Sequence, residues 1–357
     1  MENIEIKELK FEIEPKILTL VVTYKCSASC NNCCFSCNPD RNEFLSKKDA
    51  IEIITESVES FPKLSLLVIT GGEPLLQGTE YLTSIIQHAK KSKLHTRLVT
   101  NGFWAMSSSK ANKILSSLVN AGLDELNLST GDDHLEYVSV ENVIRAAIEA
   151  VKLKTNTVIN IEGHANSKFT PEDLEKNTMF KEFFNDQTNR LLIKVINGLW
   201  IPINNKGNIE YDQKGLKMVQ DMKKGCDSIL DTISIFPDKS LKSCCGLIVN
   251  EVKEFKLGYL DGNNMKGLFS QQFANFINIW LKLDGPYKIF NSLAKINPNL
   301  KLYELTHTCM VCSLFFNDDE VRKTLLSNYH KFIPEVFFKY QIHTVLSKTF
   351  ESGIKHA

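Results

Sequence analysis

Short apolar runs alternate with amphipathic segments along the first two hundred residues of the chain. The apolar, β-branched runs predict strands, and the three-to-four-residue apolar spacing between them predicts helices. The predicted strands are 18–23, 64–70, 96–100, 125–129, 157–162 and 191–196. The predicted helices are 46–59, 80–91, 110–121, 140–153 and one that begins at Pro171, with Ser46 as an N-cap and Gly122 as a C-cap.

Strands that alternate with helices in this way form a parallel α/β sheet, either open or rolled into a barrel. The carboxyl ends of such strands lie at one edge, where ligands bind. The polar and small residues that follow the predicted strands are the cysteine loop that begins at Cys26, Gly71–Pro74, Asn101, Ser129 and Asp132. We therefore expect a site at this edge.

The pattern changes after residue 205. Residues 206–250 predict a loop and a hairpin, with strands at 232–236 and 240–244, and residues 263–357 predict mainly helices rich in Phe and Tyr. The chain therefore divides into a predicted N-terminal extension (1–15), an α/β unit (16–205) and a second unit (206–357).

The charge balance and the apolar segments exclude two classes of partner. The 42 Lys and Arg residues equal the 42 Asp and Glu residues in number, whereas a broad nucleic-acid face needs a basic stripe. The N-terminal segment lacks the apolar core of a secretory signal, and no apolar stretch is long enough to span a bilayer. We expect a cytoplasmic protein that binds neither nucleic acid nor a membrane.

The ten cysteines are clustered, which in a reducing compartment points to metal or redox chemistry. Cys26, Cys30 and Cys33 share one loop. Three thiolates leave one metal position open for a substrate, whereas a structural zinc site takes four ligands. The nearby Cys34 and Cys37 leave a zinc site open as an alternative.

A second motif favours the open iron site. The glycines of Gly71-Gly72-Glu73-Pro74 let the backbone approach a ligand closely, and Pro74 stiffens the turn. This motif and the cysteine loop, each after a strand, together resemble the radical S-adenosylmethionine (AdoMet) superfamily. The resemblance implies a partial (βα)6 barrel followed by a mainly helical, cysteine-containing unit.

The resemblance also implies the cofactors and their ligands. Cys26, Cys30 and Cys33 would bind three irons of a [4Fe–4S] cluster, and AdoMet would chelate the fourth and yield a 5′-deoxyadenosyl radical on reduction. The residues expected to contact AdoMet are Gly71, Gly72 and Glu73 on the methionine side, and Asn101, Ser129 and Asp132 on the nucleoside side. For Ser129 and Asp132, turn or N-cap chemistry is an equally good interpretation.

The remaining cysteines form a second set. Four of them come from two segments and suit a fully ligated [4Fe–4S] cluster or a zinc site, of which the cluster is favoured beside a radical-forming domain: Cys226, Cys244, Cys309 and Cys312. Adjacent strand residues point to opposite faces, so Cys245 can face the barrel mouth if Cys244 binds the cluster. A thiol there can donate a hydrogen atom to a carbon radical.

Four segments together resemble the peptide epimerases of epipeptide biosynthesis, an auxiliary-cluster (SPASM-like) branch: 30–39, 100–104, 244–245 and 308–315. This resemblance implies L-to-D epimerisation in a ribosomally made precursor peptide, with hydrogen returned by Cys245 and an auxiliary [4Fe–4S] cluster among the other four cysteines. A flavodoxin or ferredoxin would supply electrons. An acidic residue expected in the hairpin has Asp231 as its nearest candidate, with Thr232 at the aligned place.

Two alternatives remain open. A maturase that forms a C–S or C–C crosslink would begin with the same radical, but its peptide would lose hydrogen and mass. A zinc-stapled binding protein without catalysis would use the cysteines and leave the Gly71–Pro74 motif unexplained.

Overall fold

The computed structural model describes residues 11, 13–163, 167–199, 201, 224–262, 264–302 and 307–354. Nine strands of these residues form one sheet in the order β6-β5-β4-β3-β2-β1-β7-β8-β9. They are β1 (Ile17–Val21), β2 (Leu66–Thr70), β3 (His95–Thr100), β4 (Glu125–Gly131), β5 (Asn156–Gly163), β6 (Ile193–Leu199), β7 (Thr232–Ile235), β8 (Ser240–Lys242) and β9 (Lys256–Tyr259). The pairs from β6 to β7 are parallel, and β8 and β9 are antiparallel additions.

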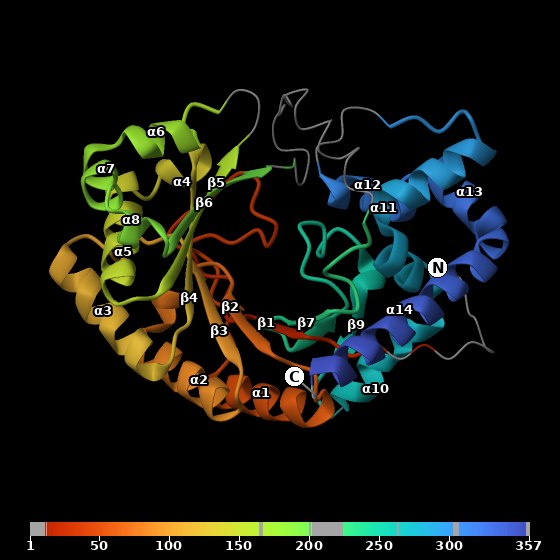
Figure 1. The fold of residues 1–357 in the computed structure, drawn as a ribbon, viewed down its shortest axis with the longest axis horizontal. Coiled ribbons are helices and arrows are strands. Elements are labelled where there is room, and N and C mark those ends of the chain that lie inside the picture. Colours follow the sequence, from red (N-terminus) through yellow and green to blue (C-terminus); the bar gives the residue numbers. More distant parts are fainter. Residues whose placement is uncertain are drawn as a thin grey trace.

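Helices of the first part lie along the outer side of the curved sheet, and those of the second part lie beyond β7–β9 (Figure 1). The first group is α1 (Lys47–Ser60), α2 (Thr79–Lys91), α3 (Ser108–Ala121), α4 (Asp132–Leu135), α5 (Val140–Lys152), α6 (Pro171–Lys176), α7 (Thr178–Phe184) and α8 (Gln187–Arg190). The second group is α10 (Met265–Ser270), α11 (Phe276–Ile296), α12 (Thr308–Asn317), α13 (Asp319–Asn328) and α14 (Ile333–Ile354). None of the described helices combines the length and apolar character that a bilayer crossing requires.

The predicted α/β alternation and its two helix caps are confirmed. The Ser46 hydroxyl accepts the Asp49 N–H at 3.0 Å at the start of α1. Gly122 closes α3 in the left-handed conformation, with φ 111°, which a glycine adopts without steric cost. The hairpin predicted around residues 237–239 is also present, as β7 and β8.

The sheet divides its side chains between two faces because successive strand residues point in opposite directions. Fully buried residues such as Leu67, Leu126 and Ile159 belong to the core cluster that also holds the buried residues of α1, α2, α3 and α5. The alternate positions, such as Asn127 on β4 and Asn160 on β5, are half-buried and point to the opposite face of the sheet, where Asn160 lines a cavity. The sequence pattern thus leaves a polar inner surface at the carboxyl ends of the strands.

The hairpin of the predicted second unit belongs to the same sheet as the first unit. β7 pairs in parallel with β1, with Thr232 beside Ile17. A second core cluster, which includes Trp280, Phe290 and Phe315, packs under the C-terminal helices. The division between residues 205 and 206 stays a prediction. Strands of both predicted units belong to one continuous sheet, in which β7 pairs with β1.

Candidate active site

The cysteine loop, Cys26–Cys37, is closed at its base by backbone pairing. Lys25 pairs with Asn38, Thr23 pairs with Phe44, and the Cys26 N–H donates to the Asn38 carbonyl at 3.1 Å. These contacts hold the two ends of the loop together just after β1.

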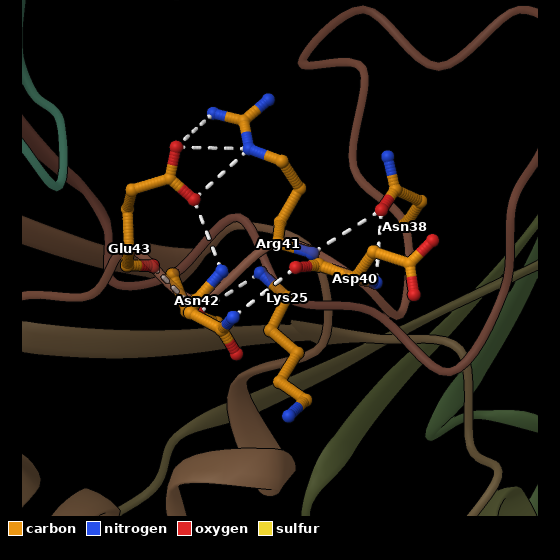
Figure 2. Close-up of polar contacts among 7 residues, drawn as sticks. Lys25, Asn38, Asp40, Arg41, Asn42 and Glu43 are labelled. Carbon is orange, nitrogen blue, oxygen red and sulfur yellow. Dashed lines mark hydrogen bonds and ion pairs between the residues drawn. The ribbon is translucent and has the colours of Figure 1, made fainter.

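A turn beside this base holds the returning chain, as Figure 2 shows. The Asn38 side-chain oxygen accepts the N–H groups of Asp40 at 2.9 Å and Arg41 at 3.2 Å. The Arg41 Nε donates to both Glu43 carboxylate oxygens at 2.9 Å. The Thr23 hydroxyl then joins the turn to β1 by donating to the Glu43 carbonyl at 3.0 Å.

The Gly71–Pro74 motif packs directly on the base of the cysteine loop. The Gly72 N–H donates to the Thr23 carbonyl at 2.7 Å, and the Glu73 N–H donates to the Lys25 carbonyl at 2.8 Å. A Cβ on Gly71 would lie 2.4 Å from the Thr23 oxygen, and one on Gly72 would lie 2.2 Å from the Lys25 oxygen. The two glycines therefore allow two backbones to approach each other, a role that our ligand-based prediction did not include.

The Glu73 side chain points into the protein and joins the ends of β2 and β3. Its carboxyl group is fully buried and accepts the Thr100 hydroxyl at 2.8 and 2.9 Å and the backbone N–H groups of Leu75 and Asn101 at 2.9 Å each. Burial raises the pKa of Glu73 to about 7, and these donors oppose that rise. We expected Glu73 to face AdoMet, but its oxygens bind protein groups instead.

The three thiols of the cysteine loop line one open cavity, whose empty space including the mouth is about 1000 Å³. The walls bring together four of the predicted AdoMet residues: Gly71, Gly72, Asn101 and Ser129. The Asn101 amide donates to the Cys26 sulfur at 3.7 Å, and the Cys37 N–H donates to the Cys33 sulfur at 3.4 Å. The strand ends thus place sulfur ligands and polar groups around a common space, as the sequence predicted.

The protonation of these thiols fits a metal-binding role. Burial raises the pKa of Cys26 to about 11 and also raises the pKa of Cys30, with Glu162 and Cys33 adding to the latter. The hydrogen bond from Cys37 lowers the pKa of Cys33 to about 6. Thiolates crowded in this way repel one another, so a cationic iron cluster would stabilise the charged forms that bind it.

Three polar residues of the cavity wall were missed by the sequence analysis. The Asn160 side-chain oxygen is buried and has no hydrogen-bond partner among the described residues, so it suits a donor group of a ligand. His134 and Glu162 form an ion pair, with Nδ1 and Oε2 2.6 Å apart. Burial disfavours the charge on His134, yet the attraction of Glu162 raises its pKa. The alternation of buried Ile159 and Ile161 with polar Asn160 and Glu162 is a sequence signal that could have found two of these residues.

Two acidic residues of the sequence analysis lie outside the cavity wall. Both oxygens of Asp132 accept backbone N–H groups, from Lys168 at 2.8 Å and Phe169 at 2.9 Å, which is the turn chemistry left open above. Asp231 forms an ion pair with Lys282 of α11. Neither carboxylate is therefore directed at a ligand in this structure.

Two cysteines of the second set, Cys244 and Cys309, lie beside Gly246. A Cβ there would lie 3.1 Å from the sulfurs of both Cys244 and Cys309. Burial raises the pKa of Cys309 to about 12 and raises the pKa of Cys244 and Cys312, and in all three Cys226 adds to the rise. The four sulfurs therefore act on one another as one group.

Backbone packing fixes the two segments that carry these sulfurs. The Cys226 N–H donates to the Leu281 carbonyl of α11 at 2.9 Å, and the Cys309 N–H donates to the His307 ring at the start of α12 at 3.1 Å. Among the described residues, no three His, Cys, Asp or Glu side chains are close enough to hold a single metal ion. A [4Fe–4S] cluster instead takes four Cys thiolates.

The segment after Cys245 contacts the cysteine loop. The Asn250 amide donates to the Cys34 carbonyl at 3.0 Å, and Leu247 and Cys34 line the same cavity. Burial raises the pKa of Cys34, and Cys245 adds to this rise. The half-buried Cys245 is therefore close enough to Cys34 for the two thiols to influence each other, and Cys34 lines the cavity.

Residues 20–166, which contain the cysteine loop and the Gly71–Pro74 motif, match the radical SAM superfamily. The chain contains a radical SAM domain. A [4Fe–4S] cluster and AdoMet are the cofactors of this family, and the cavity described above has the thiols and polar walls that fit them. The cofactors predicted for this domain are thus confirmed.

Two relatives among characterised proteins cover different shares of the chain. YydG of Bacillus subtilis (strain 168), a protein named for peptide biosynthesis, is 21% identical over 336 residues, which are 90% of this chain and 98% of YydG. The GTP 3′,8-cyclase of Helicobacter pylori is 28% identical over 155 residues, 39% of this chain and 45% of the cyclase.

Two solved structures show the fold. The enzyme anSMEcpe with bound AdoMet is 15% identical, has a TM-score of 0.55 and is covered to 99%, over 92% of this chain. Its complex with AdoMet and the Kp18Cys peptide is 14% identical, with a TM-score of 0.52 and the same coverage. The fold that this chain shares with anSMEcpe therefore covers both the α/β unit and the predicted C-terminal unit.

Gly72→Ala is expected to destabilise the protein by about 2–3 kcal/mol, because the new Cβ would meet the Lys25 carbonyl at 2.2 Å. Gly267→Ala is the matched control. Its Cβ would lie 3.9 Å from the nearest atoms, within α10, so we expect no loss of stability. Urea unfolding of the two variants measures the difference, and equal free energies of unfolding would show that the backbone contact does not need glycine.

Glu73 is expected to make the stability of the cluster-free protein depend on pH. Its pKa is about 7 when folded and 4.5 in a model compound, so the folded form holds the proton longer. Stability should therefore fall by about 3 kcal/mol as the pH rises from about 4 to about 8. Glu73→Gln cannot ionise and should lack this component. Identical pH profiles of unfolding for both proteins would contradict the assignment.

Proposed function

We propose that this chain is a radical AdoMet enzyme that converts L-residues of a ribosomally made peptide into D-residues. The proposal is supported most by Cys245, a fifth thiol whose sulfur lies 3.3 Å from the hydroxyl that also contacts Cys244, and which adds to the raised pKa of Cys34 in the cavity wall. The name of the relative YydG and the peptide bound to anSMEcpe support a peptide substrate.

Each set of thiols would hold one cluster. Cys26, Cys30 and Cys33 would bind the cluster that receives AdoMet. The auxiliary [4Fe–4S] cluster would be bound by Cys226, Cys244, Cys309 and Cys312. When bound, the first cluster and AdoMet supply the radical that removes the Cα hydrogen of the substrate. Asn101, Ser129 and Asn160 would orient AdoMet from the ends of three adjacent strands.

Cys245 would return hydrogen to the substrate from the other side of the cavity. The S–H bond breaks and a Cα–H bond forms, so the peptide keeps its mass in ordinary water and the thiol is left one hydrogen atom short. One electron from a flavodoxin or ferredoxin and one proton from solvent restore it. This chemistry needs a reducing environment, for which we propose the cytoplasm.

Variants that lack a single cysteine should distinguish the roles of the two clusters. Cys30→Ala is expected to lose one cluster's iron and all cleavage of AdoMet to 5′-deoxyadenosine. Cys309→Ala is expected to lose a similar amount of iron but to retain AdoMet cleavage at a rate within about tenfold of wild type. Iron content and 5′-deoxyadenosine formation under dithionite measure both. Zinc in place of iron, in protein prepared anaerobically, would support the non-catalytic alternative.

Turnover in D2O should place one deuterium on each epimerised residue, because the Cys245 proton exchanges with solvent. A short peptide encoded next to this gene would serve as the substrate in this test. Cys245→Ala should form 5′-deoxyadenosine but lose at least about 99% of epimer formation. The Cys34→Ala variant removes the other thiol near this part of the cavity and should keep deuterium incorporation. A product lighter by hydrogen atoms would indicate a crosslink, and deuterium incorporation by Cys245→Ala would exclude this donor.

A further inference from the structure

The hydroxyl of Ser228 lies between the two adjacent cysteines of the hairpin. Its oxygen is 3.4 Å from the Cys244 sulfur and 3.3 Å from the Cys245 sulfur. It also accepts the backbone N–H of Cys245 at 3.1 Å. Ser228 follows Cys226 by two residues, so one short segment supplies both a cluster thiol and this hydroxyl.

The chemistry of a hydroxyl restricts how these contacts are used. Serine has one O–H to donate and two lone pairs to accept with. The Cys245 N–H occupies one lone pair. All three contacts are satisfied when the Cys245 S–H donates to the second lone pair and the Ser228 O–H donates to the Cys244 sulfur. Cys244 is then an acceptor, as an iron-bound thiolate is, and Cys245 is a donor that keeps its hydrogen.

We propose that Ser228 is a positioning residue that gives the two neighbouring cysteines different tasks. Its O–H supports Cys244 as a cluster ligand, and its lone pair holds the Cys245 S–H in place as the hydrogen donor. The inference rests on the proposed function, since it assumes the auxiliary cluster and the thiol donor. It adds the group that distinguishes two chemically identical side chains.

A second serine beside the same cysteines provides a contrast. The Ser243 hydroxyl, adjacent to Cys244 in the sequence, is buried and has no hydrogen-bond partner among the described residues. A serine next to the cysteines is therefore not enough to contact their sulfurs. Ser243→Ala is a matched control because it removes the same atom from the same neighbourhood.

The test uses the anaerobically reconstituted enzyme and needs no peptide. Hydrogen bonds to cluster sulfurs help to set the reduction potential, because they stabilise the added negative charge. The auxiliary cluster is identified as the one whose electron paramagnetic resonance (EPR) signal does not change when AdoMet is added. Its reduction potential is measured by redox titration of that signal. The reactivity of Cys245 is measured as its alkylation rate by iodoacetamide, read by mass spectrometry of the peptide that contains it.

Ser228→Ala should move the auxiliary potential to a more negative value and speed the alkylation of Cys245 at least about threefold, since the thiol is no longer held. Ser228→Thr keeps the hydroxyl and should resemble wild type. Ser228→Val introduces a side chain of the same shape as threonine but without the hydroxyl, and it should resemble Ser228→Ala. Ser243→Ala should change neither quantity.

Equal potentials and equal alkylation rates for the Thr and Val variants would overturn the role of Ser228 and leave the proposed function standing. Loss of the auxiliary cluster from both variants would also overturn it, because the residue would then serve assembly. Wild-type protein without an AdoMet-insensitive cluster would instead refute the proposed function itself.

Discussion

Two backbone hydrogen bonds, from Gly72 to Thr23 and from Glu73 to Lys25, join the first two βα units at the edge of the sheet. These bonds form because Gly71 and Gly72 have no side chain that would keep the two backbone segments apart. The buried Glu73 carboxyl then ties this junction to Thr100 and to the next strand end. The loop with the three thiols and the wall opposite it are thus parts of one hydrogen-bonded unit, and the cavity depends on that unit.

The sheet connects the hairpin of the second thiol group to the strand that precedes the cysteine loop. β7 lies beside β1, which places the hairpin next to the strand that leads into the cysteine loop. The Asn250 contact with the Cys34 carbonyl joins the two regions directly. The proposed inversion at Cα would need a radical on one side of the substrate and a hydrogen donor on the other, because hydrogen must leave and return on opposite faces.

Much of this arrangement could be predicted from the sequence because it depends on local signals. Parallel strands end at a shared edge, so Asn101 and Ser129 could be placed near the cysteines without knowing the strand order. Two features could not be predicted, because each depends on partners distant in the sequence. The Glu73 carboxyl points inward and accepts the Asn101 N–H, and the Asp132 carboxylate accepts the Lys168 N–H. The pairing of β7 with β1 was missed for the same reason, because registry between remote strands leaves no local pattern.

The central claim is that Cys26, Cys30 and Cys33 hold a cluster with one iron open to AdoMet. EPR of the anaerobically reconstituted, reduced protein tests it most directly. We expect two cluster signals, of which one changes shape when AdoMet is added and disappears in the Cys30→Ala variant. Spectra that are identical with and without AdoMet, in protein that carries its full iron, would contradict it.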